Sequence, residues 1–207
     1  MARIRDRLFE LPVVYRAWQA PFIEQKLRPL RARGEIARAT NVLDVGCGPG
    51  TNTPAFEHAD YLGVDINPDY IATASKRFGR SFLTADVVTF NWPVERRFDF
   101  VLVNSLLHHL STPEASRLLA ALSERLKPAG HIHIVDLVLP KNRVSFPWML
   151  AKLDRGDFAR PLADLSALVN ESLEVVDFEP VPLRLAGVTL WDCAYFKARA
   201  KPANAQN

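Results

Sequence analysis

Residues 42–50 read VLDVGCGPG, and this stretch decides the fold. The run VLDV predicts a buried β-strand, and the glycines at positions 46, 48 and 50 predict a tight turn directly after it. Glycine has no Cβ, so such a turn can adopt positive φ and let a ligand approach the main chain. The spacing is G-x-G-x-G, which differs from the dinucleotide pattern G-x-G-x-x-G. The stretch therefore predicts a ligand-binding turn at the end of a first strand.

Strands and helices alternate along the chain from residue 41 to residue 136. Short apolar runs predict strands at 41–45, 61–64, 81–85, 98–103 and 131–136. Asn67 is suited to cap a helix that ends near Phe78, and Ser111 or Thr112 is suited to cap a second helix that continues to Leu126. The sequence KPAG at 127–130 is expected to end this second helix. This alternation predicts an α/β fold with a parallel sheet and right-handed crossovers.

The pattern changes after residue 136. Residues 137–171 contain three prolines and several aromatic residues, and they predict one or two short helices joined by the loop DRGDFAR at 154–160. Two late strands are expected at 173–178 and 190–198, with PVPLRLAGVT between them as a loop. Such a pair favours an antiparallel hairpin at the edge of the sheet. We expect residues 1–207 to form a single domain.

Composition excludes several classes of protein. The chain of 207 residues is 48% hydrophobic and 24% charged, which argues against disorder and coiled coils. No apolar run approaches the ~18 residues of a membrane-spanning helix, and the first residues do not read as a secretory signal. Cys47 and Cys193 are too far apart to suggest a disulfide framework or a metal motif, so no metal is expected and a reducing cytoplasm fits best.

The positive charge is concentrated near the amino terminus. Residues 1–38 hold nine Lys/Arg and four Asp/Glu, a net charge of +5, and the remaining residues hold seventeen against nineteen, a net charge of −2. This basic segment is either a solvated helix face or a contact for an anionic partner such as a lipid surface. Basic runs with interleaved aromatic residues are absent, so no nucleic-acid partner is expected.

Carboxylates end three consecutive predicted strands. Asp44 ends the first, where it either organises the loop by accepting main-chain N–H bonds or faces a cationic ligand. Asp65 ends the second, where an acid can accept hydrogen bonds from both hydroxyls of a ribose. Asp86 ends the third and can accept from an adenine amino group, while Ile66 and Val87 can sandwich the base. Three acids after a triple-glycine turn favour a nucleoside ligand over three unrelated turn residues.

The chain resembles the class I S-adenosylmethionine-dependent methyltransferases. The matching stretches are VLDVGCGPG, LGVDIN, LTADV, FDFVLVNSLLHHL and LKPAGHIHIVD, and the late hairpin matches the closing strands of that family. The resemblance implies a Rossmann-like sheet of seven strands in the order 3-2-1-4-5-7-6, with the last strand antiparallel and helices on both faces. It also implies S-adenosylmethionine as the cofactor.

The resemblance also implies roles for individual residues. The glycine turn and the backbone around Asp44 would meet the methionine part, Asp65 the ribose, and Asp86 the adenine. Tyr15 could donate to the carboxylate of the donor. The predicted cofactor-binding residues are Asp44, Gly46, Cys47, Gly48, Gly50, Asp65, Ile66, Asp86, Val87, Asn104 and Tyr15.

The fourth predicted strand ends in NSLLHHL at 104–110, where chemistry is expected. The Asn/Asp-Pro-Pro-aromatic motif of base- and amino-methylating relatives is missing here. The pattern S-x-L-H-H-L instead resembles the small-molecule subgroup, methyltransferase type 11 or 25. Members of this subgroup include natural-product, sugar, quinone and lipid-head-group enzymes. A hydroxyl acceptor benefits from a general base, and imidazole suits that role at neutral pH. His109 is the first candidate base and His108 the second. Asp136 could orient a histidine or act as the base, and two structural histidines are the alternative.

These residues predict transfer of a methyl group to oxygen of a small molecule. The alternatives are methylation at carbon or nitrogen of a quinone or lipid head group, a donor-binding or RNA-binding protein without catalysis, and a dehydrogenase. The oligomeric state is left open.

Two segments are expected to cover the acceptor site: residues 1–38 as a basic helical lid and the insertion at 137–171. Tyr15, Trp18 and Phe22 share one helical face, which either packs on the core or closes an apolar pocket. Arg155 and Arg160 either clamp an acidic group or lie in a solvated loop. The apolar insertion and the basic segment together keep peripheral contact with a lipid membrane open.

Overall fold

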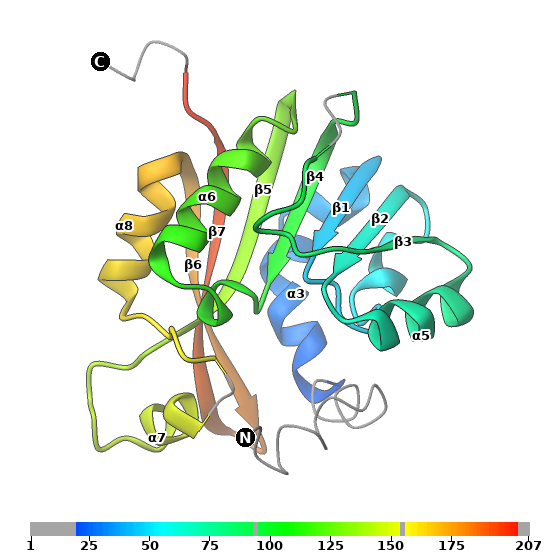
Figure 1. The fold of residues 1–207 in the computed structure, drawn as a ribbon. Coiled ribbons are helices and arrows are strands. Elements are labelled where there is room, and N and C mark those ends of the chain that lie inside the picture. Colours follow the sequence, from blue (N-terminus) through cyan, green and yellow to red (C-terminus); the bar gives the residue numbers. More distant parts are fainter. Residues whose placement is uncertain (1–19, 93–94, 154–155, 203–207) are drawn as a thin grey trace.

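The computed structural model describes residues 20–92, 95–153 and 156–202 (Figure 1). The helices are η1 (Ala20–Phe22), α3 (Ile23–Ala32), α4 (Glu35–Arg38), η2 (Thr53–Phe56), α5 (Pro68–Phe78), η3 (Leu107–His109), α6 (Thr112–Ser123), α7 (Phe146–Leu153) and α8 (Leu162–Ser172). The strands are β1 (Asn41–Val45), β2 (Asp60–Asp65), β3 (Ser81–Thr84), β4 (Phe98–Asn104), β5 (Leu126–Val138), β6 (Leu173–Leu185) and β7 (Val188–Ala200).

The strands form one sheet in the order β3-β2-β1-β4-β5-β7-β6, as predicted. Strands β1 to β5 pair in parallel, and β7 runs antiparallel to both of its neighbours, β5 and β6. The strand order reverses between β1 and β4, so the carboxyl ends of these two strands border the crevice where ligands bind in such sheets.

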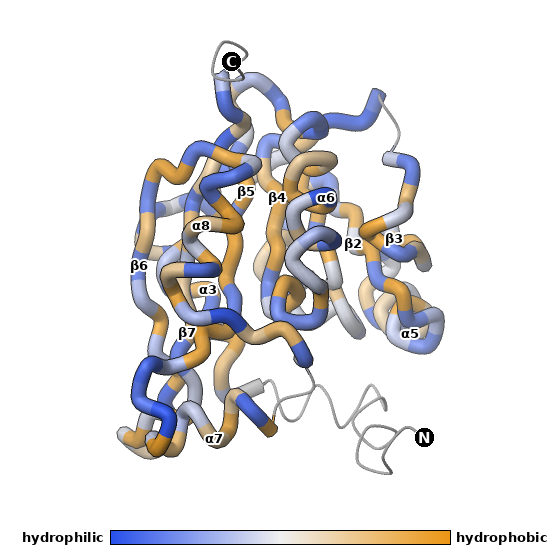
Figure 2. The backbone as a smooth tube through the Cα atoms, turned by 60° about the vertical axis from the view of Figure 1, so that its left-hand side comes forward, coloured by the Kyte–Doolittle hydropathy of each residue, from blue (hydrophilic) through white to orange (hydrophobic). Residues whose placement is uncertain are grey.

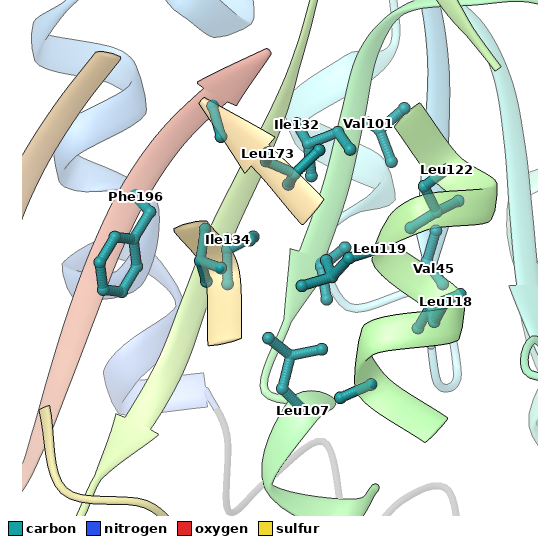
Figure 3. Close-up of a cluster of buried hydrophobic side chains, with 14 of the residues drawn as sticks. Val45, Val101, Leu107, Leu118, Leu119, Leu122, Ile132, Ile134, Leu173 and Phe196 are labelled. Carbon is teal, nitrogen blue, oxygen red and sulfur yellow. The ribbon is translucent and has the colours of Figure 1, made fainter. Parts of the chain in front are cut away.

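Apolar residues alternate between the two faces of the sheet, and each face is covered. Val101 and Val103 belong to the cluster that α6 and α8 cover. Figure 3 shows Leu119 and Leu122 of α6 beside Val101 in this cluster. Phe100 and Leu102 face the opposite cluster, which contains Leu27 of α3. Burial on both faces explains why the central strands read as continuous apolar runs in the sequence.

The cap expected for the first helix is present. The Asn67 side chain accepts from the N–H of Asp69 at 2.9 Å and of Tyr70 at 3.3 Å, and Pro68 occupies the first turn of α5. The second helix, α6, begins after Ser111, whose N–H donates to the Glu114 carboxylate at 2.8 Å.

The end of α6 differs from the prediction. The helix ends at Ser123 rather than continuing to Leu126, because Leu126 begins β5 and pairs with Phe98. The ladder shifts its register between Phe98 and Phe100, so residues 127–130 form an irregular part of a strand instead of a loop. Gly130 is required there, since a Cβ would lie 2.6 Å from the carbonyl oxygen of Phe98.

The late hairpin is longer than predicted. Most of the stretch expected as a loop belongs to β6 and β7, and only Ala186 and Gly187 form the turn, with φ of 48° and 81°. Pro180 and Pro182 indicate a loop in the sequence, but β6 is an edge strand, where a residue without an N–H is tolerated.

The segment before β1 lies against the hairpin. Phe22 packs edge-on against Trp191 of β7, with ring centres 5.4 Å apart. Tyr15 and Trp18, predicted to share a face with Phe22, lie outside the described residues. Among the residues that the structure describes, none of the helices combines the length and the apolar character needed to cross a bilayer.

Replacing Leu119 with Ala should lower the free energy of unfolding by about 2–5 kcal/mol, because this fully buried side chain fills the space between α6 and the sheet. Urea denaturation measures the change. Leu153→Ala is the matched control: Leu153 is 54% exposed, so its truncation should cost about 0.5 kcal/mol or less. Equal losses in the two variants would contradict the assigned core.

Candidate active site

The glycine turn after β1 has the shape that its sequence predicts. Gly46, Gly48 and Gly50 have φ of 71°, 55° and 76°. The N–H of Gly46 donates to the Val64 carbonyl at 2.8 Å, which fixes the turn to β2. A Cβ on Gly46 would lie 3.1 Å from the side chain of Leu106, so the turns after β1 and β4 touch each other.

Asp44 lies beneath this turn and is fully buried. Its carboxylate accepts from the Tyr61 hydroxyl at 2.8 Å and from the Asn52 amide at 3.2 Å. Burial raises the pKa of Asp44 to about 6, although the bonds from Tyr61 and Asn52 oppose that rise. The carboxylate thus contacts the loop through the side chains of Tyr61 and Asn52, whereas one of the two alternatives predicted from the sequence was main-chain N–H donors.

Asp65 connects the end of β2 to the glycine turn. One carboxylate oxygen accepts from the Gly48 N–H at 2.8 Å, and the other accepts from the Asn67 N–H at 2.9 Å. Burial raises the pKa of Asp65. The N–H of Ile66 also stabilises this carboxylate, and since a carboxylate offers about four lone pairs, it keeps capacity for a ligand hydroxyl.

The surroundings of Asp65 fit the apolar part of a nucleoside. Ile66 is 66% exposed, an unusual position for a large aliphatic side chain on a structured turn. Val87 is buried, and Asp86 is exposed and accepts from the Val88 N–H at 3.0 Å. The residue types predicted for a ribose and a base are therefore present at the ends of β2 and β3.

A chain of polar side chains links the glycine turn to helix α3. The Asn104 amide donates to the Asn52 oxygen at 3.1 Å, and the Ser105 hydroxyl donates to the Asn104 oxygen at 3.2 Å. Lys26 donates to the Ser105 hydroxyl at 2.8 Å, although the lysine is only 6% exposed. Ser105 has a φ of 57°, strained for a residue with a side chain. Nothing in the sequence distinguishes Lys26 from the other cations of its basic helix.

His108 and Asp136 form a buried pair beside this chain, with Nδ1 and Oδ1 2.6 Å apart. The Asp136 carboxylate also accepts from the N–H groups of Leu106 at 3.1 Å, Leu107 at 2.5 Å and Leu137 at 2.7 Å. Burial alone would raise the pKa of Asp136, but His108 and the N–H groups lower it. An ionised Asp136 accepts a proton-donating bond from His108 and so keeps a proton of the ring on Nδ1.

His109, the first candidate base in the sequence, lies exposed beside this pair. The centres of the His108 and His109 rings are 4.2 Å apart. The structure thus brings His108 to Asp136 and gives His109 the more accessible position.

The insertion covers His108. Gly156 packs so closely on the imidazole that a Cβ would lie 2.1 Å from His108 Cδ2, and the Phe158 N–H donates to the His108 carbonyl at 3.0 Å. Arg160 is buried and donates to the carbonyls of Leu107 at 2.8 Å and Leu110 at 2.7 Å. Arg160 therefore links the insertion to the turn after β4. This role differs from both predicted alternatives, a clamp on an acidic group of the substrate and a position in a solvated loop. Arg155 lies outside the described residues.

The cysteines and acids do not assemble a metal site in the part of the chain that the structure describes, where no group of three or more His, Cys, Asp or Glu side chains is arranged to hold an ion. Cys47 and Cys193 are both buried, and burial raises the pKa of Cys47 far above its ordinary value.

Comparisons with known proteins agree with this geometry. A family model described as a methyltransferase domain matches residues 42–130. The chain is 30% identical over 191 residues to a trans-aconitate 2-methyltransferase of Methylobacterium nodulans, covering 86% of this chain and 71% of that protein. It is 29% identical over 196 residues to the protein of the same name from Methylobacterium radiotolerans, covering 88% and 72%.

The fold is also similar to that of solved structures. The N-methyltransferase NodS from Bradyrhizobium japonicum, in complex with S-adenosyl-L-homocysteine, superimposes with a TM-score of 0.68 at 19% sequence identity. The match covers 86% of this chain and 87% of that chain.

Replacing Asp136 with Asn should lower the free energy of unfolding by about 3–5 kcal/mol at neutral pH, since an amide cannot accept from every donor that surrounds the carboxylate. The pKa of Asp136 is lowered in the folded state, so its stabilisation exists above the ordinary carboxyl pKa of about 4. The difference from wild type should therefore shrink as the pH falls through and below that value.

Urea denaturation at a series of pH values measures this difference. Asp192→Asn is the control, because burial raises the pKa of Asp192 and its neutralisation should not destabilise the fold. A difference between Asp136→Asn and wild type that does not change with pH would contradict the assigned charge of Asp136.

Proposed function

Because the chain belongs to the class I S-adenosylmethionine-dependent methyltransferases, we propose that it methylates a hydroxyl oxygen of a small-molecule acceptor with the assistance of His108 and Asp136. The methyl donor and the class of reaction follow from membership of the family. The choice of oxygen rests on one observation, the buried bond of 2.6 Å between His108 and Asp136 at the carboxyl ends of β4 and β5.

The residues at the ends of β1 to β4 suit the donor. Bound S-adenosylmethionine supplies a methyl group on a positively charged sulfur. The carboxylates of Asp44 and Asp65 give this edge of the sheet a negative charge that attracts a cation. Asp65 retains lone pairs for the ribose hydroxyls, and the exposed side chain of Ile66 offers an apolar surface to the base. The cofactor-binding residues predicted from the sequence are all proposed to contact the donor.

The pair acts on the proton of the acceptor. With its Nδ1 proton held by Asp136, His108 can receive the hydroxyl proton on Nε2 while the acceptor oxygen attacks the methyl carbon. Asp136 already accepts four hydrogen bonds, so its role is to position His108 and to stabilise the imidazolium that forms. His109, exposed at the same turn, is the second candidate base.

The acceptor site is proposed to lie over the turn after β4, within a single domain. Helix α3 reaches this turn through Lys26, and the insertion reaches it through Gly156. These contacts support the roles proposed for the segments at 1–38 and 137–171 as covers of the acceptor.

A carboxylate is the second candidate acceptor. Two relatives are named as trans-aconitate methyltransferases, and the buried cation of Lys26 beside Ser105 would favour an anionic substrate. A carboxylate carries no proton at neutral pH, so its methylation needs no general base. The two acceptor classes therefore differ in how far they depend on His108.

His108→Gln should reduce methylation of hydroxyl acceptors by about 10²–10⁴-fold, because the general base is lost. The measurement is S-adenosylhomocysteine formation with a panel of phenols and sugars, and with trans-aconitate as the carboxylate probe. His58→Gln is the control and should keep full turnover, because His58 lies just before β2 begins and bonds to the Ile36 carbonyl at 3.0 Å.

Two other outcomes would change the assigned base or the assigned acceptor. Loss of turnover in His109→Gln with retention in His108→Gln would transfer the role of base to His109. If the chain methylates only trans-aconitate, and His108→Gln does not affect that turnover, the acceptor is a carboxylate and not a hydroxyl group.

Affinity for S-adenosylmethionine should fall as the pH falls below about 6, by up to about tenfold per pH unit, because the cationic donor favours the ionised form of Asp44. Binding in this range should release a proton, which calorimetry in buffers of different ionisation enthalpy detects. Asp44→Asn should bind more weakly and release no proton near pH 6. Affinity that stays constant across this range would show that Asp44 does not sense the donor.

A further inference from the structure

One end of the molecule exposes large apolar side chains that the site does not use. They come from α7 with the residues before it and from the β6–β7 turn, and we call them the tip patch: Val144, Phe146, Met149, Leu153, Leu185 and Val188. Val144 is 93% exposed, and the others are 45–55% exposed. Large apolar groups gathered in this way mark an interaction surface.

The two parts of the tip patch lie side by side. Helix α7 contacts β7, and Figures 1 and 2 both place α7 beside the β6–β7 turn. Phe146, Met149 and Leu153 are spaced i, i+3 and i+7, so they share one face of α7. Ala151 is buried against the core, which means that the helix packs through its other face.

The two stretches of chain that carry the tip patch hold charges of one sign. Lys141, Arg143 and Lys152 flank or belong to α7, and Arg184 precedes the turn; all four are exposed. Residues 137–153 and 183–190 contain no Asp or Glu. Trp148 is partly buried with Lys152 6.0 Å from its ring centre, an arrangement suited to the boundary between an apolar phase and water.

We propose that the tip patch docks on the surface of an anionic lipid bilayer. Apolar side chains ringed by cations match both parts of such a surface, since the acyl region takes the apolar groups and the head groups take the charges. A second copy of the chain fits poorly, because a two-fold contact would set the four cations of one copy against those of the other. The same insertion reaches His108 through Gly156, so docking would bring the bilayer close to the acceptor site, a link that rests on the proposed function.

Vesicle co-sedimentation tests the docking, with phosphatidylcholine vesicles and with vesicles of phosphatidylcholine and phosphatidylglycerol in equal parts. The wild-type chain should bind the anionic vesicles, and salt should weaken the binding. The charge-reversed variant Lys141→Glu/Arg143→Glu and the polar variant Phe146→Ser/Met149→Ser should each bind at least about tenfold more weakly. Val176→Ser is the matched control, because Val176 is 41% exposed near the opposite end of β6.

Two results would overturn the docking. One is the absence of binding, or equal binding to neutral and anionic vesicles. The other is a wild-type dimer, measured by analytical ultracentrifugation, that Phe146→Ser/Met149→Ser dissociates, since the tip patch would then be an interface between copies. Calorimetry with S-adenosylmethionine on each variant shows whether its fold is intact. Because this readout does not involve the acceptor, the test of membrane docking stays separate from the test of the proposed acceptor.

Discussion

The buried carboxylate of Asp136 organises the centre of the site, because an anion removed from water must be surrounded by donors. Its donors come from the turn after β4 and from β5 itself, so the requirement fixes the path of the chain at the carboxyl ends of these two strands. Asp44 and Asp65 impose the same requirement on the turn after β1. Hydrogen bonds within the protein therefore hold the carboxyl edge of the sheet in place, and alignment of a nucleophile with a methyl group depends on such fixed geometry.

Local sequence was sufficient wherever a few neighbouring residues determine the structure. The glycine turn, the bounds of β1 and the Asn67 cap follow from side-chain size, φ preference and hydrogen-bonding groups within a few positions. The strand order followed from the resemblance of the motifs to a family, not from periodicity. Errors arose where pairing between distant segments overrides local signals, as when the edge position of β6 accommodates Pro180 and Pro182 and when Leu126 joins β5.

The candidate site shows the same limit. Adjacent histidines are equivalent in the sequence, and only the proximity of Asp136, 28 positions after His108, distinguishes them. Lys26 reaches Ser105 across 79 positions, and Gly156 meets the imidazole through the path of an insertion that has no regular pattern. Such contacts depend on how helices and loops pack on the finished sheet, and no spacing rule contains that information.

The proposed function requires that the ends of β1, β2 and β3 hold the nucleoside of the methyl donor. A crystal structure of the chain with S-adenosylhomocysteine tests it directly. We expect both ribose hydroxyls to lie within hydrogen-bonding distance of the Asp65 carboxylate and the adenine to lie against Ile66. A nucleoside bound elsewhere, or a ribose out of reach of Asp65, would contradict it.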